Sequence, residues 1–540
     1  MTQWVVRGAG LVVSAILGAF AIGCSGAAGD GSDAAEEKFS SANATLVDFT
    51  FDGELTTTSP TTTAIRTQML YTVGHLNAEP GVARLDKLAL TNVTSASLGG
   101  GLYQVRYHAR LPVAWGHKDA VPATYTLTLP HRVDGTGQSQ FLTKYQGSCN
   151  DGEGAEINAG NFWFHYRPHA RGCSFTSADV MTAKATVAKD AQNTSGKYPE
   201  YDKVWADGEL RVVAVFGKYT KGATAQDDPG IAAYNGFVNA VRDALGSPET
   251  FPAGLPRSPG VSAADVTLKS TRADGRAVMV TAILVDEVQS APPSFDKRYA
   301  ELTPGADVIL YNGHAGLGAN VRALAHKGQF FPGSYQIFFM NGCDTFAYMD
   351  TDTTLATTRT PLNPDDPAGT KYMDFVTNAM PAFFSSMPDA SMSLLRALFA
   401  PAAPQTYEQI FAHVDPSQVV VVTGEEDNAF TPAAPIGTPA YVLDGDVAHA
   451  AVQTIATGVL APGRYAVEMT ADPAFPGADA DLFARVGAVP DTTSAFKCPS
   501  YKWNSNERCV FTVASPAAIE MKVSGYSSAD AKYGLRVWPL

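Results

Sequence analysis

Basic side chains are scarce in this 540-residue sequence, which has 39 Lys and Arg against 53 Asp and Glu and a formal net charge of −14. A chain of this charge would repel a phosphate backbone, so a nucleic-acid partner is not expected. Motifs of several common enzyme classes are also missing. The sequence has no HExxH motif of zinc peptidases, no G-x-S-x-G motif of serine hydrolases and no phosphate-binding P-loop. Catalysis by this chain would need a different set of residues.

The hydrophobic run near the N-terminus is too short for a membrane-spanning helix. Arg7 precedes an apolar segment at 11–22, an arrangement typical of an export signal. The segment ends in Ala21-Ile22-Gly23-Cys24, which resembles a bacterial lipobox and predicts lipidation of Cys24. Residues 19–21 also fit an ordinary A-x-A cleavage site. Both interpretations predict export, either as an outer-membrane or cell-surface lipoprotein with a lipid anchor in the membrane, or as a secreted protein.

Cysteine is rare, with six residues in the whole chain. Export makes disulfides favourable. Cys149 and Cys173 flank one loop-rich segment, and Cys498 and Cys509 flank another, so each pair is predicted to form a local disulfide. Cys343 is left over from this scheme. A leftover cysteine in an oxidising compartment favours nucleophilic catalysis, with a buried structural thiol as the alternative.

The length predicts several domains, because one hydrophobic core does not grow to this size. Alternating strand patterns at 44–187 predict an N-terminal all-β sandwich. A continuous apolar strand near 210–216 then opens a region of strands and helices, which predicts an α/β domain with a mainly parallel sheet. Evenly spaced strand and turn features near the C-terminus predict a second β-sandwich. The expected division is a signal peptide at 1–24, a flexible tether at 25–43, the N-terminal domain at 44–187, a linker at 188–208, the α/β domain at 209–430, a linker at 431–440 and the C-terminal sandwich at 441–540.

Two apolar runs at 308–311 and 337–340 are predicted to be buried parallel strands joined by a helix. Each run ends in Asn-Gly followed by one reactive side chain, His314 in the first case and Cys343 in the second. Parallel strands connected in this way have their carboxyl ends at the same edge of the sheet, where open α/β sheets bind ligands. We therefore expect His314 and Cys343 to lie close together.

A cysteine nucleophile needs a base that takes the thiol proton and hydrogen-bond donors that hold an oxyanion. Cys343 would attack a carbonyl carbon while His314 handles the protons. Backbone N–H groups of the two turns would face the oxyanion, and the residues expected to support this are Gly313, Ala315, Gly316 and Gly342. This chemistry requires no cofactor.

The motifs NGH at 312–314 and NGCDT at 341–345 resemble those of the clan CD cysteine peptidases, the group of caspases, legumain, clostripain, gingipain and separase. The resemblance implies a caspase–haemoglobinase-like fold and an endopeptidase that cleaves proteins or peptides. It also implies that His314 is the catalytic base and Cys343 the nucleophile. One position departs from the family pattern, because Ala315 stands where a Gly usually follows the His, and Gly316 comes one place later.

Two other interpretations stay open. Ala315 favours an inactive cell-surface binding or adhesion lipoprotein, and the same dyad would also suit acyl transfer without proteolysis. If the substrate is basic, an acidic pocket is expected near the sheet edge, and the residues predicted to contribute are Asn341, Asp344, Glu425, Glu426 and Asp427.

The C-terminal region carries the ordered motifs G-x-Y, DADLF, C-P-x-Y and N-E-x-C between 441 and 540. This order resembles the bacterial pre-peptidase C-terminal domain, a small β-sandwich attached to many secreted peptidases. The resemblance makes Asp479 and Asp481 candidate ligands of a structural calcium ion. The alternative is that both are solvated turn residues.

Overall fold

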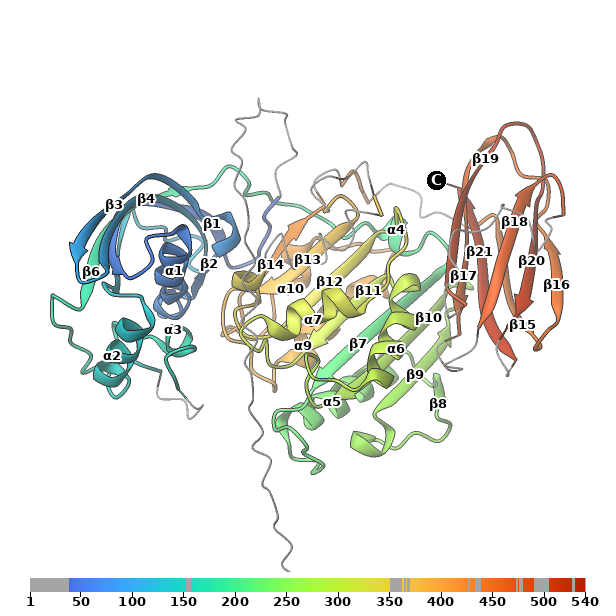
Figure 1. Cartoon of the computed structure of the whole chain (residues 1–540). Coiled ribbons are helices and arrows are strands. Elements are labelled where there is room, and N and C mark those ends of the chain that lie inside the picture. Colours follow the sequence, from blue (N-terminus) through green and yellow to red (C-terminus); the bar gives the residue numbers. More distant parts are fainter. Residues whose placement is uncertain are drawn as a thin grey trace, which may run out of the picture. The chain divides into compact units, whose positions relative to one another are not determined.

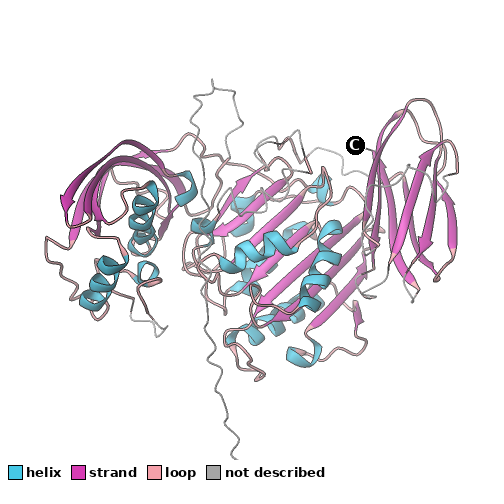
Figure 2. Ribbon diagram, in the orientation of Figure 1, coloured by secondary structure: helices cyan, strands magenta, loops and turns pink. Residues whose placement is uncertain are grey.

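A computed structural model describes the chain in several stretches: residues 38–151, 157–349, 362–363, 366, 370–425, 428–432, 439–472, 474, 479–489, 505–526 and 530–539. The strands of these stretches form four sheets. One curled sheet lies near the N-terminus, one large mixed sheet is central, and two small sheets follow at the C-terminal end of the chain (Figures 1 and 2).

The N-terminal region is not the all-β sandwich that its strand patterns predict. It has one antiparallel sheet in the order β2-β4-β1-β6-β5, with β3 paired to β4. Helix α1 packs against β1, β2 and β5 of this sheet (Figure 1). The elements are β1 (Thr45–Thr57), α1 (Thr62–Leu76), β2 (Gly81–Ala83), η1 (Leu85–Lys87), β3 (Ala89–Gly99), β4 (Leu102–Trp115), β5 (Thr124–Pro130), α2 (Gly135–Tyr145), α3 (Phe162–His165) and β6 (Val180–Lys189).

The prediction missed α1 because the helix is buried on most sides, so that its sequence has no clear polar face. Its threonines also favour strands. Residues 162–166 lie within the segment whose patterns predict strands, because aromatic side chains are typical of strands. In the structure Phe162 lies in a short helical turn, with its ring centroid 6.4 Å from that of Tyr71 and 6.0 Å from that of Phe141.

The predicted disulfide between Cys149 and Cys173 is present. Cys509 is also disulfide-bonded, while Cys498 and Cys24 lie outside the described residues. The predicted tether is too long at its C-terminal end, because Phe39 and Ser40 are buried and Ser40 pairs with Val422. None of the helices in the described stretches is long and apolar enough to cross a membrane.

The central sheet has the order β14-β13-β12-β11-β7-β10-β9-β8. Strands β10, β7, β11, β12 and β13 run parallel, and antiparallel strands complete both edges, in agreement with the predicted mainly parallel sheet. The strands are β7 (Glu209–Gly217), β8 (Glu249–Phe251), β9 (Asp265–Thr271), β10 (Ala277–Val285), β11 (Val308–Asn312), β12 (Gln336–Asn341), β13 (Met373–Asn378) and β14 (Val420–Gly424).

Helices cover both faces of this sheet, and alternate strand residues enter two different cores. Val212 and Leu310 pack with α5, α9 and α10, whereas Val213 and Ile309 pack with α6 and α7 (Figure 1). Each fully buried side chain of this size contributes about 1.5–3 kcal/mol. The helical elements are α4 (Tyr201–Val204), α5 (Pro229–Ala244), η2 (Gly260–Ala263), α6 (Pro293–Leu302), η3 (Thr303–Gly305), α7 (Ala319–Lys327), η4 (Thr345–Tyr348), α9 (Met387–Leu398) and α10 (Tyr407–Phe411).

Two antiparallel sheets make up the C-terminal region and share one hydrophobic core, as expected for a β-sandwich. Their orders are β15-β21-β17-β19 and β16-β20-β18. The strands are β15 (Tyr441–Val447), β16 (Val452–Ala456), β17 (Gly463–Ala471), β18 (Ala480–Val486), β19 (Glu507–Val513), β20 (Ile519–Gly525) and β21 (Ala531–Pro539).

Candidate active site

Strand register places His314 and Cys343 at equivalent positions on neighbouring strands. Asn312, the last residue of β11, pairs with Asn341, the last residue of parallel β12. Each reactive residue follows its asparagine by two positions. The parallel strands β7, β10, β11, β12 and β13 can be numbered 1 to 5 in chain order. Their order across the sheet is then 2-1-3-4-5, so the direction in which strands are added reverses between β7 and β11. The carboxyl ends of strands beside such a switch are where this type of sheet binds ligands.

Gly342 allows the two turns to touch. A Cβ atom at this position would lie 2.8 Å from the carbonyl oxygen of Gly313 and 3.3 Å from the backbone nitrogen of Ala315. Any side chain here would force the turns apart, since real Cβ contacts under 3.0 Å are essentially absent. Close packing of the two turns thus explains why a glycine stands at position 342, next to the candidate nucleophile.

The imidazole of His314 is solvent-exposed and lies between two aromatic rings. Its centroid is 5.1 Å from that of Tyr219, which follows β7, and 4.9 Å from that of Phe384. Nε2 lies 3.1 Å from the carbonyl oxygen of Tyr219. A carbonyl oxygen only accepts, so Nε2 carries the hydrogen in this contact and Nδ1 of the neutral ring keeps its lone pair. His314 is therefore held in a tautomer suited to act as a base through Nδ1.

Cys343 is a half-buried thiol in the neighbouring turn. Its Sγ donates to the carbonyl oxygen of Ala382 at 3.6 Å. Ala382 belongs to the loop after β13, and the backbone N–H of Asp344 donates to Met380 in the same loop. The loop after β13 therefore flanks Cys343 on one side, and the His314 turn contacts Gly342 on the other.

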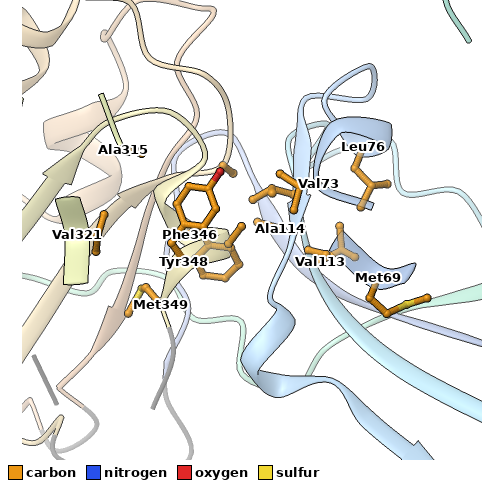
Figure 3. Close-up of a cluster of buried hydrophobic side chains, with 14 of the residues drawn as sticks. Met69, Val73, Leu76, Val113, Ala114, Ala315, Val321, Phe346, Tyr348 and Met349 are labelled. Carbon is orange, nitrogen blue, oxygen red and sulfur yellow. The ribbon is translucent and has the colours of Figure 1, made fainter. Parts of the chain in front are cut away.

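Ala315 follows His314 without visible backbone strain. It is not among the residues with a left-handed backbone, and its side chain is 5% exposed. The methyl group belongs to a buried hydrophobic cluster with Val321, Phe346 and Tyr348 (Figure 3). Its backbone N–H donates to no acceptor among the described residues. This N–H group is thus available to a negatively charged oxygen.

A buried amide network holds the strand ends below the two turns, and Asn341 is its centre. Asn341 Nδ2 donates to Asn312 Oδ1 at 2.9 Å and to the carbonyl oxygen of Met387 at 3.0 Å. Asn341 Oδ1 accepts from Asn378 Nδ2 at 3.0 Å and from Gln418 Nε2 at 2.7 Å. Asn341 is fully buried, so its predicted role in a substrate pocket is wrong. Its side-chain amide makes its hydrogen bonds with other buried groups of the protein.

The predicted acidic pocket does not form from its other described members either. Asp344 is fully buried and Glu425 is 2% exposed, so neither carboxylate faces solvent. The remaining two predicted members, Glu426 and Asp427, lie outside the described residues. Charged groups are costly to bury and turn inward only where a partner holds them. Asn77 Nδ2 is such a partner, donating to Asp344 Oδ1 at 2.9 Å.

The calcium prediction stays a prediction. The described residues contain no group of three or more His, Cys, Asp or Glu side chains arranged to hold a metal ion. Asp479 precedes β18 and is partly buried, which raises the pKa of its carboxyl, and the charge of Lys297 acts in the opposite direction. Asp481 lies in β18, opposite Ser524.

Asp344 gives the fold a testable pH dependence. Burial raises the pKa of Asp344 from 3.8 to about 7, while the bond from Asn77 and the charge of Arg167 act in the opposite direction. The protonated carboxyl of Asp344 makes its full contribution to the free energy of unfolding below pH 3.8, and this contribution is lost as the pH rises through about 7. Asp344→Asn has no proton to lose, so we expect its melting temperature to rise relative to the wild type as the pH is raised through this window. Calorimetry at a series of pH values measures the difference, and parallel curves would contradict this account.

Asp228, which was not among the predicted site residues, supports His314 indirectly. Its carboxylate caps α5 by accepting from the N–H groups of Gly230 and Ile231, and it also accepts from Tyr219 at 3.1 Å and Thr220 at 2.9 Å. Burial acts to raise the pKa of Asp228, but these four N–H groups lower it below its ordinary value. The carboxylate thus fixes the Tyr219 segment whose carbonyl holds His314.

Asp228→Ala is expected to lower stability by about 0.5–2 kcal/mol, as for other helix caps. It should also slow any reaction that depends on His314 by at least about 10-fold, because small misplacements of a reacting group are costly. The matched control is Asp134→Ala, which removes the cap of α2 and its bonds to Thr136 and Gly137. Urea denaturation and steady-state kinetics measure both quantities. Equal kinetic losses in the two variants would show that Asp228 acts only through stability.

Comparison with known proteins gives weak similarities. No protein-family model and no curated protein matches the chain. Among solved structures, it is similar to the pre-peptidase C-terminal domain of a collagenase from Bacillus anthracis, with 14% identity, 18% of this chain and 89% of that chain covered, and a TM-score of 0.15. It is also similar to the lipase BlEst2 of Bacillus licheniformis in propeptide form, with 9% identity, 62% and 75% covered, and a TM-score of 0.15. At these scores neither similarity decides the activity of this chain.

Proposed function

We propose that this chain is an exported cysteine endopeptidase that cleaves peptide bonds with a dyad of His314 and Cys343. The observation that carries the proposal is the register of β11 and β12, which sets the two residues at matching positions beside the strand-order switch. The clan CD resemblance of the two turn motifs supports the same reading and implies a caspase–haemoglobinase-like domain. The dyad itself requires no cofactor.

We assign the proton transfers to Nδ1 of His314, the nitrogen whose lone pair the contact of Nε2 with Tyr219 leaves free. Nδ1 takes the proton from Cys343 Sγ as the sulfur attacks the carbonyl carbon of the scissile bond. The carbonyl of Tyr219 keeps its bond to Nε2–H and stabilises the imidazolium that forms. Nδ1–H then protonates the leaving amine, and the C–N bond breaks to leave a thioester on Cys343. A water molecule then gives a proton to Nδ1 as its oxygen attacks the thioester carbon, the C–S bond breaks to release the acid, and Nδ1–H passes the proton to the sulfur, which restores the thiol and the neutral imidazole.

Backbone geometry supplies the remaining element of the mechanism. The N–H of Ala315 lies beside Gly342 and would donate to the oxyanion of the tetrahedral intermediate. Because Gly342 has no side chain, a peptide can approach Cys343 closely. The amide network centred on Asn341 would keep both turns in register during the reaction.

An extracellular location is compatible with the disulfide between Cys149 and Cys173. The lipidation of Cys24, the calcium site at Asp479 and Asp481 and the pre-peptidase character of the C-terminal region belong to the proposal. Mass spectrometry of the protein purified from membranes would detect a lipid on Cys24.

Hydrolysis of fluorescently labelled casein by the purified chain tests the proposed activity. We expect cleavage by the wild type and none by Cys343→Ala. Cleavage that persists in Cys343→Ala would overturn the proposal. An inert, folded wild type would favour the binding and adhesion interpretation instead.

A further inference from the structure

Two large hydrophobic side chains stand exposed on segments that contact the dyad. Tyr219 is 53% exposed and its ring lies against His314. Phe383 is 51% exposed and directly follows Ala382, whose carbonyl accepts the Cys343 thiol. Single exposed hydrophobic residues are common on protein surfaces. Here both lie on segments that contact the dyad residues, so a ligand bound at the dyad can reach them.

The two side chains stand on backbone that is already fixed. Tyr219 is held through its N–H by Asp228, and its ring packs edge-on against Phe384 with centroids 5.5 Å apart. The carbonyl of Phe383 accepts from the backbone N–H of Ser386 at 2.9 Å and of Met387 at 3.1 Å. Because this backbone is already fixed, the protein would lose little conformational entropy when a substrate covers the two side chains.

Asp344, Glu425 and Asp228 do not favour a basic substrate residue. The carboxylates of Asp344 and Glu425 are buried, and the carboxylate of Asp228 is occupied by four backbone N–H groups. Lys218, next to Tyr219 in sequence, is paired with Asp286 at 2.6 Å. Among the large apolar side chains of these two segments, those of Tyr219 and Phe383 are the exposed ones.

We propose that the enzyme prefers a large apolar residue, aromatic or aliphatic, on the acyl side of the scissile bond, with Tyr219 and Phe383 as the specificity-determining residues. This inference rests on the proposed peptidase function. A preference for an apolar residue takes the place of the preference for a basic residue that the predicted acidic pocket would have given. The substrate side chain would cover the two rings while its carbonyl carbon faces Cys343 Sγ.

Peptidyl acyloxymethylketones that differ only in the residue on the acyl side test the preference. The full chain is treated with probes carrying Phe, Leu, Arg, Lys or Asp, and the second-order rate constant of Cys343 labelling is measured for each. We expect the Phe and Leu probes to react at least about 10-fold faster than the charged ones, as hydrophobic contacts of this size provide. Equal rates, or faster labelling by a charged probe, would overturn the preference.

Three variants assign the preference to its residues. Tyr219→Ser and Phe383→Ser are each expected to reduce the ratio of the Phe rate to the Arg rate, while Cys343 still reacts. Tyr526→Ser is the matched control, because Tyr526 is 57% exposed in the C-terminal region, and its ratio should equal that of the wild type. Unchanged ratios in both test variants would contradict the assignment. If every peptide probe fails while iodoacetamide labels Cys343, the peptidase function itself is refuted.

Discussion

His314→Ala is expected to lower kcat/KM for peptide cleavage by about 10²–10⁴-fold, the range that a positioned general base contributes. The structural reason is the contact of Nε2 with the Tyr219 carbonyl, which leaves Nδ1 to accept the thiol proton. The folded state should change little, because the imidazole is solvent-exposed. A large kinetic loss without a loss of stability would therefore separate a catalytic role from a structural one.

His413→Ala is the control for this prediction. His413 is also exposed and belongs to the same region, directly after α10, but it is not at the carboxyl ends of β11 and β12. We expect its kinetics to match the wild type within about 2-fold, as for surface changes remote from a site. Full activity in His314→Ala would eliminate the dyad.

The second large effect concerns stability. Asn341→Ala removes four hydrogen bonds from the buried amide network and leaves several polar groups with fewer partners. Asn378 and Gln418 remain bonded to each other, which limits the damage. We expect a loss of about 2–4 kcal/mol in the free energy of unfolding, since each unsatisfied buried group costs about 1–3 kcal/mol.

Urea denaturation measures this loss, and hydrogen exchange of β11, β12 and β13 locates it. Gln140→Ala on the exposed surface of α2 serves as a control and should change stability by less than about 0.5 kcal/mol. Because the network lies below the turns that carry His314 and Cys343, Asn341→Ala should also slow the proposed peptide cleavage. An unchanged unfolding midpoint would show that the network is dispensable.

The sequence was sufficient to predict the strands that carry the site. The runs at β11 and β12 are short, apolar and stopped by Asn-Gly, which is a strong local signal, and the parallel pairing followed from the helix between them. The helical spacing of the apolar residues at 228–245 likewise indicates the helix that the structure shows as α5. These features depend on residues close together in the chain.

The features that were missed depend on contacts between distant residues. Asn341 looked like a pocket residue because asparagine is polar, but its side chain meets Asn378 and Gln418 only in the folded sheet. The partner of His314 is a backbone carbonyl, which no side-chain pattern can reveal. Helix α1 was missed because burial on most sides removes the polar face that marks a surface helix.

Covalent labelling of Cys343 is the most direct test of the dyad. The purified chain is treated with a peptidyl acyloxymethylketone, and mass spectrometry locates the adduct in the wild type and in His314→Ala. We predict an adduct on Cys343 in the wild type that is lost or strongly reduced in His314→Ala. Absence of any adduct in a folded protein whose Cys343 reacts with iodoacetamide would contradict the peptidase account.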